Sequence, residues 1–232
     1  MHILSPLGRL QSAGVLYTAP SGQIAEMAAL RAVAVAALSA PTPIAHWSPY
    51  QSFGKWSGTV PKGATIDHES LWIGVITPCR YERTTGSKSH CAAADTEIKN
   101  VPYPPLSDHT FEWHDMIAAF NAAQDQFNML ELGAVWAKWA VDAAALGRIR
   151  NKKVRAIAVE AQPAHCAWGK QHIMLNKASR SVRMLCGAVS VKDGTVRFPV
   201  ARRGGHWGLG LQHLVDNKPE GDAIDEVPAH SI

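Results

Sequence analysis

The strongest pattern of hydrophobic positions in the chain lies between residues 108 and 147. Apolar side chains recur there every three or four residues, a spacing that places them on one face of an α-helix. They are Trp113, Met116, Ile117, Phe120, Phe127 and Leu130, and then Val135, Trp139, Ala143 and Leu146. Asp108 is a suitable N-cap, and Gly147 is a suitable residue just beyond a helix end. The pattern therefore predicts a long helical segment over about 108–147, interrupted at Gly133.

Three other stretches have the composition of β-strands. The runs "LWIGVIT" (71–77) and "KVRAIAVE" (153–160) are short and rich in β-branched residues. The stretch 181–200 predicts a hairpin, because its dipeptide Asp193-Gly194 suits a two-residue turn between twisted strands. With that turn, one face of the hairpin is apolar and the other is polar, so the register is self-consistent.

The helical and strand signals come in blocks rather than in alternation, which indicates an α+β fold. We expect the long helical segment at about 108–147 to pack on a C-terminal antiparallel β region. The predicted regions are an N-terminal arm with an alanine-rich helix at 1–45, a single α+β domain at 46–215, and an acidic C-terminal tail at 216–232.

A further apolar run occupies residues 27–45. Its alanines and valines predict a helix from about Ile24 to Leu38, ended by Pro41 and Pro43. The alternative is an export signal, since Arg31 lies near the start of the run and small residues precede His46. No run reaches the roughly 20 apolar residues that cross a bilayer, so we expect no membrane span.

The overall composition is that of a folded protein. Hydrophobic residues make up 47% of the 232 residues and charged residues 18%, so the chain can bury a core of its own. Eight tryptophans against five phenylalanines and four tyrosines is a high ratio. Because tryptophan is frequent at interfaces, we expect some of these rings on contact surfaces.

The charges are strongly segregated along the chain. Between residues 148 and 203 there are thirteen basic and two acidic residues, whereas the rest of the chain holds ten basic and seventeen acidic residues. Such segregation can create a basic face that holds a polyanion, with tryptophans adding stacking on unpaired bases. The alternative is that this region docks on the acidic remainder, within the chain or on a neighbouring copy. The candidate polyanion- or partner-binding residues are Arg180, Arg183, Arg197, Arg202, Arg203, Trp168 and Trp207.

A second candidate chemistry is a metal site. The stretch "SKSHCAAADTE" places His90 and Glu97 seven residues apart, and "EWH" with His114 follows. This arrangement resembles the zinc D-alanyl-D-alanine peptidases, which carry Ser-x-His, an acid seven residues later, and then an acid before Trp-His. Here Glu97 replaces the usual aspartate, and Glu112 lies one residue too close to His114. The resemblance implies a metal-dependent hydrolase that uses His90, Glu97 and His114.

The four cysteines bear on the compartment. Cys79, Cys91, Cys166 and Cys186 allow three pairings in an oxidised protein. Pairing of sequence neighbours, Cys79 with Cys91 and Cys166 with Cys186, is the geometrically easy arrangement. Four cysteines are also ordinary in a reducing cytoplasm, where buried cysteine acts as a small hydrophobe. We expect free thiols.

Together these observations favour a non-enzymatic subunit that acts through protein contacts and a basic face, such as a component of a virus- or phage-like particle. We expect a homo-oligomer or larger assembly and no cofactor. The alternatives are the metal-dependent hydrolase and a nucleic-acid-binding module without base specificity. The favoured location is the cytoplasm or a particle, with export as the alternative.

Overall fold

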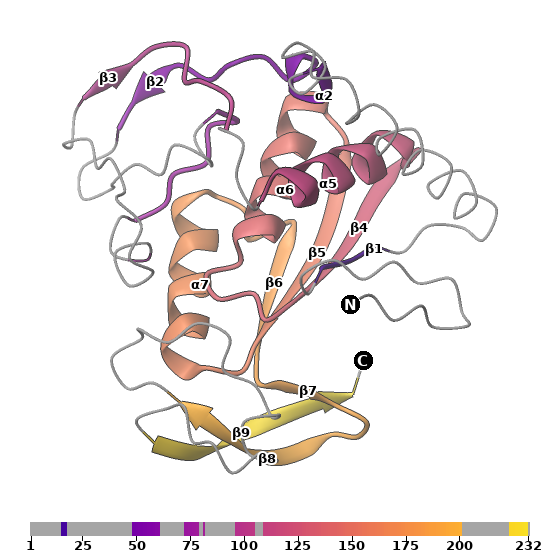
Figure 1. Cartoon of the computed structure of the whole chain (residues 1–232), viewed down its shortest axis with the longest axis vertical. Helices are drawn as coiled ribbons and strands as arrows, with labels where there is room; N and C mark the ends of the chain where they lie inside the picture. Colours follow the sequence, from indigo (N-terminus) through magenta and orange to yellow (C-terminus); the bar gives the residue numbers. More distant parts are fainter. Residues whose placement is uncertain are drawn as a thin grey trace, which may run out of the picture.

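The structure, a computed structural model, describes residues 15–17, 48–60, 72–78, 81, 96–104, 109–200 and 223–231. Within these ranges helices and several β-sheets occur together, so the protein is a mixed α and β protein (Figure 1). Several expected features lie outside the described residues: the helix at about 24–38, the export-like segment 27–45, and Cys79, His90, Cys91, Arg202, Arg203 and Trp207.

The main sheet has the strand order β1-β4-β5-β6. Its strands are β1 (Val15–Tyr17), β4 (Gln126–Leu132), β5 (Lys153–Glu160) and β6 (Val182–Cys186). The last three are parallel neighbours, and β1 pairs antiparallel with β4. Three helices accompany the sheet: α5 (Thr110–Ala122) before β4, α6 (Lys138–Arg150) between β4 and β5, and α7 (Pro163–Leu175) between β5 and β6.

Outside the main sheet, its helices and a second sheet, the described elements are short. The helix α2 spans Ser48–Gln51, and strands β2 (Gly58–Thr59) and β3 (Glu97–Ile98) form a two-stranded pair. No described helix combines the length and apolarity needed to cross a membrane.

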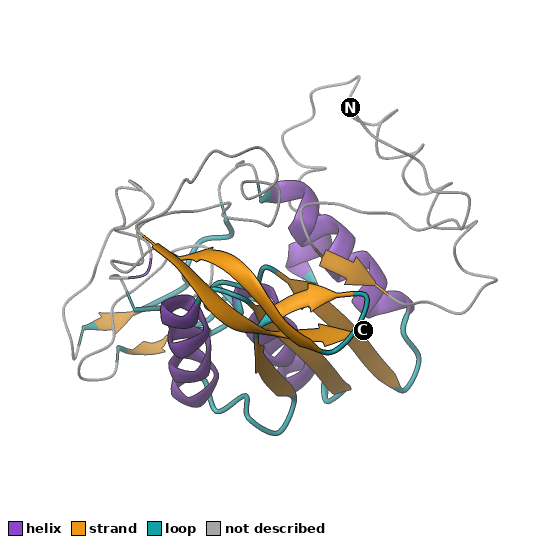
Figure 2. Ribbon diagram, turned by 90° about the horizontal axis from the view of Figure 1, so that it is seen from below, coloured by secondary structure: helices purple, strands orange, loops and turns teal. Residues whose placement is uncertain are grey.

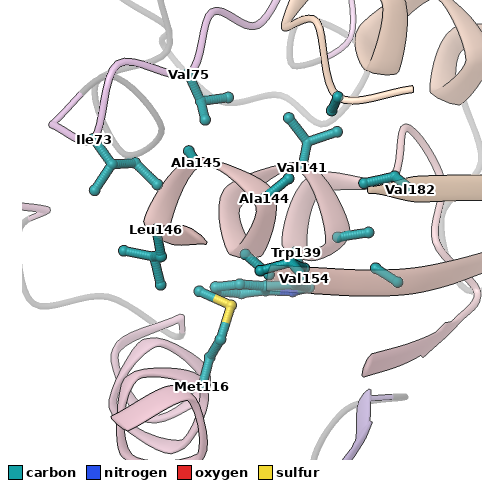
Figure 3. Packing of buried hydrophobic residues seen from close by; sticks show 14 of the residues in the cluster. Ile73, Val75, Met116, Trp139, Val141, Ala144, Ala145, Leu146, Val154 and Val182 are labelled. Atoms are coloured by element: carbon teal, nitrogen blue, oxygen red, sulfur yellow. The ribbon is translucent and has the colours of Figure 1, made fainter. Parts of the chain in front are cut away.

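The main core lies on the helical face of the parallel strands. Along β5, Val154, Ala156 and Ala158 are buried on one face. Lys153, Arg155 and Ile157, on the other face, are exposed. Figure 3 shows α6 between Val154 on one side and the segment of Ile73 and Val75 on the other. This helix is buried almost all round from Lys138 to Gly147, and its four small alanines permit this close packing.

The expectation of a helical segment over 108–147 was wrong in its middle. Helix α5 ends at Ala122 and α6 begins at Lys138, and the intervening residues form strand β4. Phe127, Met129 and Glu131 alternate with more exposed residues, because β4 pairs along its whole length with β5. The helices therefore pack on a parallel sheet rather than on a C-terminal antiparallel region.

The end of α6 also differs from the expectation. The helix continues past Gly147 to Arg150, and Asn151 ends it with a φ of 50°. Gly147 is needed for close packing instead, since a Cβ there would lie 2.5 Å from Val154 Cγ2 and 2.8 Å from the Lys152 carbonyl oxygen.

Of the two predicted single strands, one is confirmed and one is wrong. The run 153–160 forms β5 with the predicted bounds. The described part of the run 71–77 forms a turn and then irregular backbone, although Trp72, Val75 and Thr77 are buried. Gly74 has a φ of 80°, a left-handed conformation that ends any extended strand there.

The hairpin expected over 181–200 was wrong. Strands β7 (Ala188–Ser190) and β8 (Gly194–Val200) are separated by β9 (Ala223–Ser231), which is parallel to β7 and antiparallel to β8. Part of the expected acidic C-terminal tail, residues 223–231, therefore supplies the middle strand of the second sheet, which lies below the main sheet in Figure 1 and nearest the viewer in Figure 2. Val227 and Ala229 of β9 alternate with exposed residues and are themselves buried.

Candidate functional site

Two buried glutamates mark the carboxyl ends of adjacent parallel strands. Glu131 ends the buried face of β4 and is 3% exposed, and Glu160 ends β5 and is 6% exposed. Charged side chains are rarely buried without a specific partner. Open α/β sheets bind ligands just outside the carboxyl ends of their strands. This edge of the sheet is therefore the candidate functional site.

Glu131 accepts hydrogen bonds from the backbone N–H groups at the start of helix α6. Its two carboxylate oxygens accept hydrogen bonds from the backbone N–H groups of Trp139 (3.2 Å) and Ala140 (2.9 Å). These N–H groups belong to the first turn, where no intrahelical acceptor exists. Ala137, the residue at the N-cap, provides no side-chain cap. Glu131 thus fixes the position of α6 relative to the end of β4.

Glu160 joins the two loops that leave the site. One carboxylate oxygen accepts from the N–H of Val135 at 2.8 Å, and the other accepts from the N–H of Gln162 at 2.7 Å. The neighbouring Val159 carbonyl accepts from the N–H groups of Gly133 and Ala134, both at 3.0 Å. The β4–α6 loop is consequently folded tightly against the end of β5.

The β4–α6 loop, residues 133–137, has an uncommon backbone. Gly133, Val135 and Ala137 have φ values of 69°, 50° and 58°. A β-branched residue such as Val135 avoids this left-handed region, which costs it on the order of 1–3 kcal/mol. Backbone of this kind persists only when surrounding contacts hold it, and it concentrates at ligand sites.

An ion pair lies within the first two turns of α6. Lys138 Nζ is 2.9 Å from an Asp142 carboxylate oxygen, and both residues are buried. The ammonium group also lies over the rings of Trp113 (4.8 Å from the centroid) and Trp139 (4.3 Å). The Lys138 charge is thus neutralised within the protein.

Burial governs the protonation of Glu131. Desolvation raises the pKa of Glu131 from 4.5 to about 8, and the charge of Asp142 adds to this increase. The amide hydrogen bonds and the charge of Lys138 oppose the increase in pKa without cancelling it. The carboxyl at the end of β4 therefore titrates near neutral pH.

The β5–α7 connection is fixed by a cap and by a disulfide. The side-chain oxygen of Gln162 accepts from the Ala164 N–H at 2.8 Å, which caps α7. Cys166 in the first turn of α7 is bonded to Cys186 at the end of β6, with a Cα–Cα distance of 5.6 Å. The expectation of free thiols was wrong for this pair, because parallel pairing of β5 and β6 brings Cys186 beside Glu160 and under α7.

Aromatic and imidazole groups hold the loop from the other side. Tyr81 stacks between Trp136 (ring centroids 5.8 Å apart) and Trp168 (4.9 Å). His172 places one ring nitrogen 3.0 Å from the Trp136 carbonyl oxygen and the other 3.1 Å from Thr77 Oγ1. Trp168, expected on a binding surface, is half-buried in this stack.

The described basic residues among those proposed from the sequence, Arg180, Arg183 and Arg197, lie away from this edge. Arg183 is exposed on β6, on the sheet face opposite the helices, and Arg180 is exposed in the turn before β6. Arg197 is exposed on β8 directly opposite Glu226 of β9. Cross-strand neighbours of opposite charge attract each other, so Arg197 has an acidic neighbour within the chain.

The residues of the proposed metal site do not gather in the described part of the chain. Glu97 is exposed on β3 and lies 3.3 Å from Lys99 Nζ, and His114 on α5 contacts the ring of Tyr50 edge-on. His90 lies outside the described residues. Among the residues that the structure describes, no three metal-ligating side chains are close enough to share an ion.

The two glutamates of the site were not predicted from the sequence. The available signal was an acid at the end of an apolar strand followed by a helix, twice in succession. Recognising it required assigning residues 126–132 to a strand rather than a helix. No protein family, curated protein or solved structure matches the chain.

Proposed function

We propose that the carboxyl edge of β4 and β5 binds a nucleoside cofactor, with the Glu160 carboxylate accepting the ribose hydroxyls. The observation that carries this proposal is the position of Glu160, at the end of the second strand and against the first strand–helix loop. In dinucleotide-binding folds an acid at this position, about 20 residues after the loop, binds the ribose. The β4-α6-β5-α7-β6 arrangement is the same unit of alternating parallel strands and helices.

Glu160 retains the acceptor capacity that a ribose needs. A carboxylate offers roughly four lone-pair sites, and the N–H groups of Val135 and Gln162 occupy two of them. Two sites remain for a pair of neighbouring hydroxyls. The backbone bonds also fix the carboxylate, which lowers the entropic cost of binding.

The loop argues against a pyrophosphate in the cofactor. Dinucleotide loops carry glycines so that the backbone can approach the pyrophosphate. Here Gly133 is followed by Ala134, Val135, Trp136 and Ala137. The Trp136 side chain is largely buried, and its carbonyl oxygen lies within hydrogen-bonding distance of His172, so the loop is bulky and fixed. A nucleoside without a pyrophosphate fits this loop better.

The charges at the edge point to a cationic cofactor. The site carries the acidic side chain of Glu160, while Glu131, with a pKa of about 8, carries little charge at pH 7 and the nearby Lys138 is neutralised by Asp142. S-adenosylmethionine combines adenosine with a positively charged sulfonium and has no phosphate. When bound, it supplies an electrophilic methyl group, so we propose methyl transfer as the reaction class. The protein's residues hold the ribose and shape the loop.

The proposal is tested by calorimetric titration of the full chain with S-adenosylmethionine, S-adenosylhomocysteine and NAD+. We expect both adenosyl compounds to bind and NAD+ not to bind. Glu160→Ala is expected to weaken binding at least about tenfold, which corresponds to about 1.4 kcal/mol. Glu226→Ala, which removes an exposed acid on β9, is the control and should not change the affinity. A folded protein that binds NAD+ alone, or that binds neither S-adenosylmethionine nor S-adenosylhomocysteine, would contradict the proposal.

The role as an assembly subunit stays a prediction. Buried glutamates and a left-handed loop are costly features that a purely structural subunit does not need. For this reason the cofactor site ranks first. Homo-oligomerisation is compatible with either role.

A further inference from the structure

In the described part of the chain, one face of the main sheet is exposed toward the amino ends of its strands. Parallel sheets are normally buried on both faces, and their strands are then apolar throughout. Here α6 and α7 cover one face of β4, β5 and β6, and β4 and the first part of β5, as far as Ile157, alternate between buried and more exposed residues. On the other face Arg155 and Arg183 are exposed, and Ile157, which pairs with Arg183, is 39% exposed. An apolar helix does not fit a face patterned in this way.

The register brings the basic side chains of this face together. Ile157 of β5 pairs with Arg183 of β6, so Arg155 and Arg183 lie on neighbouring strands, two positions apart. Lys153 precedes Arg155 by two residues, about 6.6 Å along the strand, and points to the same face. Arg180 is exposed in the turn that leads into β6. We call Lys153, Arg155, Arg180 and Arg183 the basic face.

The four cations of the basic face have no acidic partner in the described part of the chain. The ion pairs found there join other residues, Lys99 with Glu97 and Lys138 with Asp142. Asp125, just before β4, is the one acidic residue in the short segments that precede β4, β5 and β6. Unpaired exposed cations on neighbouring strands create a local positive potential that attracts a polyanion.

We propose that the basic face binds the phosphate backbone of a nucleic acid. Lysine and arginine contacts to phosphates release counterions, which provides affinity without base recognition. The described strand residues on this face include no aromatic ring, so stacking on bases is not expected to contribute. The basic face lies toward the amino ends of the strands, away from Glu160. This proposal therefore does not rest on the cofactor proposal.

An acidic patch on a second copy is a weaker candidate for the partner. Asp225 and Glu226 are exposed on β9, but neighbouring residues of a strand point to opposite faces. They therefore do not form one patch that matches the basic face. Closely spaced phosphates do match it.

The test is fluorescence anisotropy with the full chain and a labelled single-stranded DNA of about 20 nucleotides, longer than the roughly 4–16 nucleotides of a typical single-strand site. The variant Arg155→Ala/Arg183→Ala removes two cations of the basic face. The control variant Lys170→Ala/Lys192→Ala removes two exposed cations from α7 and from the turn before β8. We expect the first variant to bind at least about tenfold more weakly. The slope of log affinity against log salt should fall by about 1.4, or about 0.7 for each lost phosphate contact. The control should stay within about twofold.

Three outcomes would overturn the proposal. The first is absence of binding by the folded wild type at low salt, and the second is equal loss in both double variants. The third is a particle mass of Arg155→Ala/Arg183→Ala, measured by light scattering, that differs from the wild type while its DNA affinity does not. That result would make the basic face a contact between copies. Titration with S-adenosylmethionine in parallel should give equal affinities for both variants, and it separates failure of this proposal from failure of the cofactor site.

Discussion

The backbone N–H of Val135 donates a 2.8 Å hydrogen bond to the carboxylate of Glu160, and this bond joins the first loop of the parallel sheet to the end of its second strand. Val135 adopts a φ of 50°, which valine disfavours, and its N–H meets Glu160 in that conformation. The local preference of the residue is therefore overruled by a long-range contact at the candidate site.

The loop conformation leads to a prediction about Val135→Gly. Glycine adopts positive φ without steric cost. We therefore expect Val135→Gly to lower the free energy of unfolding by less than about 1 kcal/mol, or to raise it slightly. Val196→Gly is the control, since Val196 is similarly half-buried in an extended strand, and it should lose about 1 kcal/mol or more. Urea unfolding of both variants measures the difference. Equal losses would show that the loop does not strain Val135.

Glu131 predicts a pH dependence of stability. Its pKa is raised from 4.5 to about 8 in the folded protein, so between these values the folded state holds a proton that the unfolded state releases. The stability from this group is therefore full below about pH 4.5 and declines as the pH rises through 8. Each unit of pKa shift corresponds to about 1.4 kcal/mol, so we expect a decline of a few kcal/mol.

Urea unfolding at pH 5 and pH 8 checks this expectation. Glu131→Gln cannot ionise, and its free energy of unfolding should decline less between the two pH values than that of the wild type. Glu226→Gln, on the exposed surface of β9, should follow the wild type. A Glu131→Gln profile parallel to the wild type would mean that another group controls the pH dependence.

The sequence predicted local elements well where neighbours along the chain decide them. Strand β5 was predicted with its observed bounds, because apolar residues alternate with basic ones as the two sheet faces require. Strand β4 was missed, because Phe127 and Leu130 are three residues apart and fit a helix equally well. Only pairing with β5 decides between the two structures.

Contacts between distant parts of the chain account for the other differences. The Asp193-Gly194 turn favours a hairpin locally, but β9 from the end of the chain takes the position between the two strands. Asp193 instead accepts hydrogen bonds from Ser231 N (2.7 Å) and Ser231 Oγ (3.1 Å). The same limit applies to the candidate site, since Glu160 resembles a surface acid until parallel pairing places it beside Val135.

The disulfide between Cys166 and Cys186 gives a third prediction. The bond closes a loop with a sequence separation of 20, and a loop of this length contributes about 3 kcal/mol in the chain-entropy model. We expect reductant to lower the midpoint of urea unfolding of the wild type by a corresponding amount. Cys166→Ala/Cys186→Ala should start near the reduced value and be insensitive to reductant. If reductant lowers the midpoint of this variant equally, other cysteines are responsible.

The buried pair Lys138–Asp142 gives the last prediction. Lys138→Met keeps the length of the side chain but leaves the Asp142 carboxylate buried without its countercharge, and loss of one partner of such a pair costs about 3–5 kcal/mol. Lys138→Met/Asp142→Leu removes both charges, so the double variant should be more stable than Lys138→Met alone. Lys99→Ala, at the exposed pair with Glu97, is the control and should change stability by less than about 1 kcal/mol. A double variant less stable than Lys138→Met would mean that Asp142 stabilises the fold through contacts other than Lys138, and that the start of α6 depends on its charge.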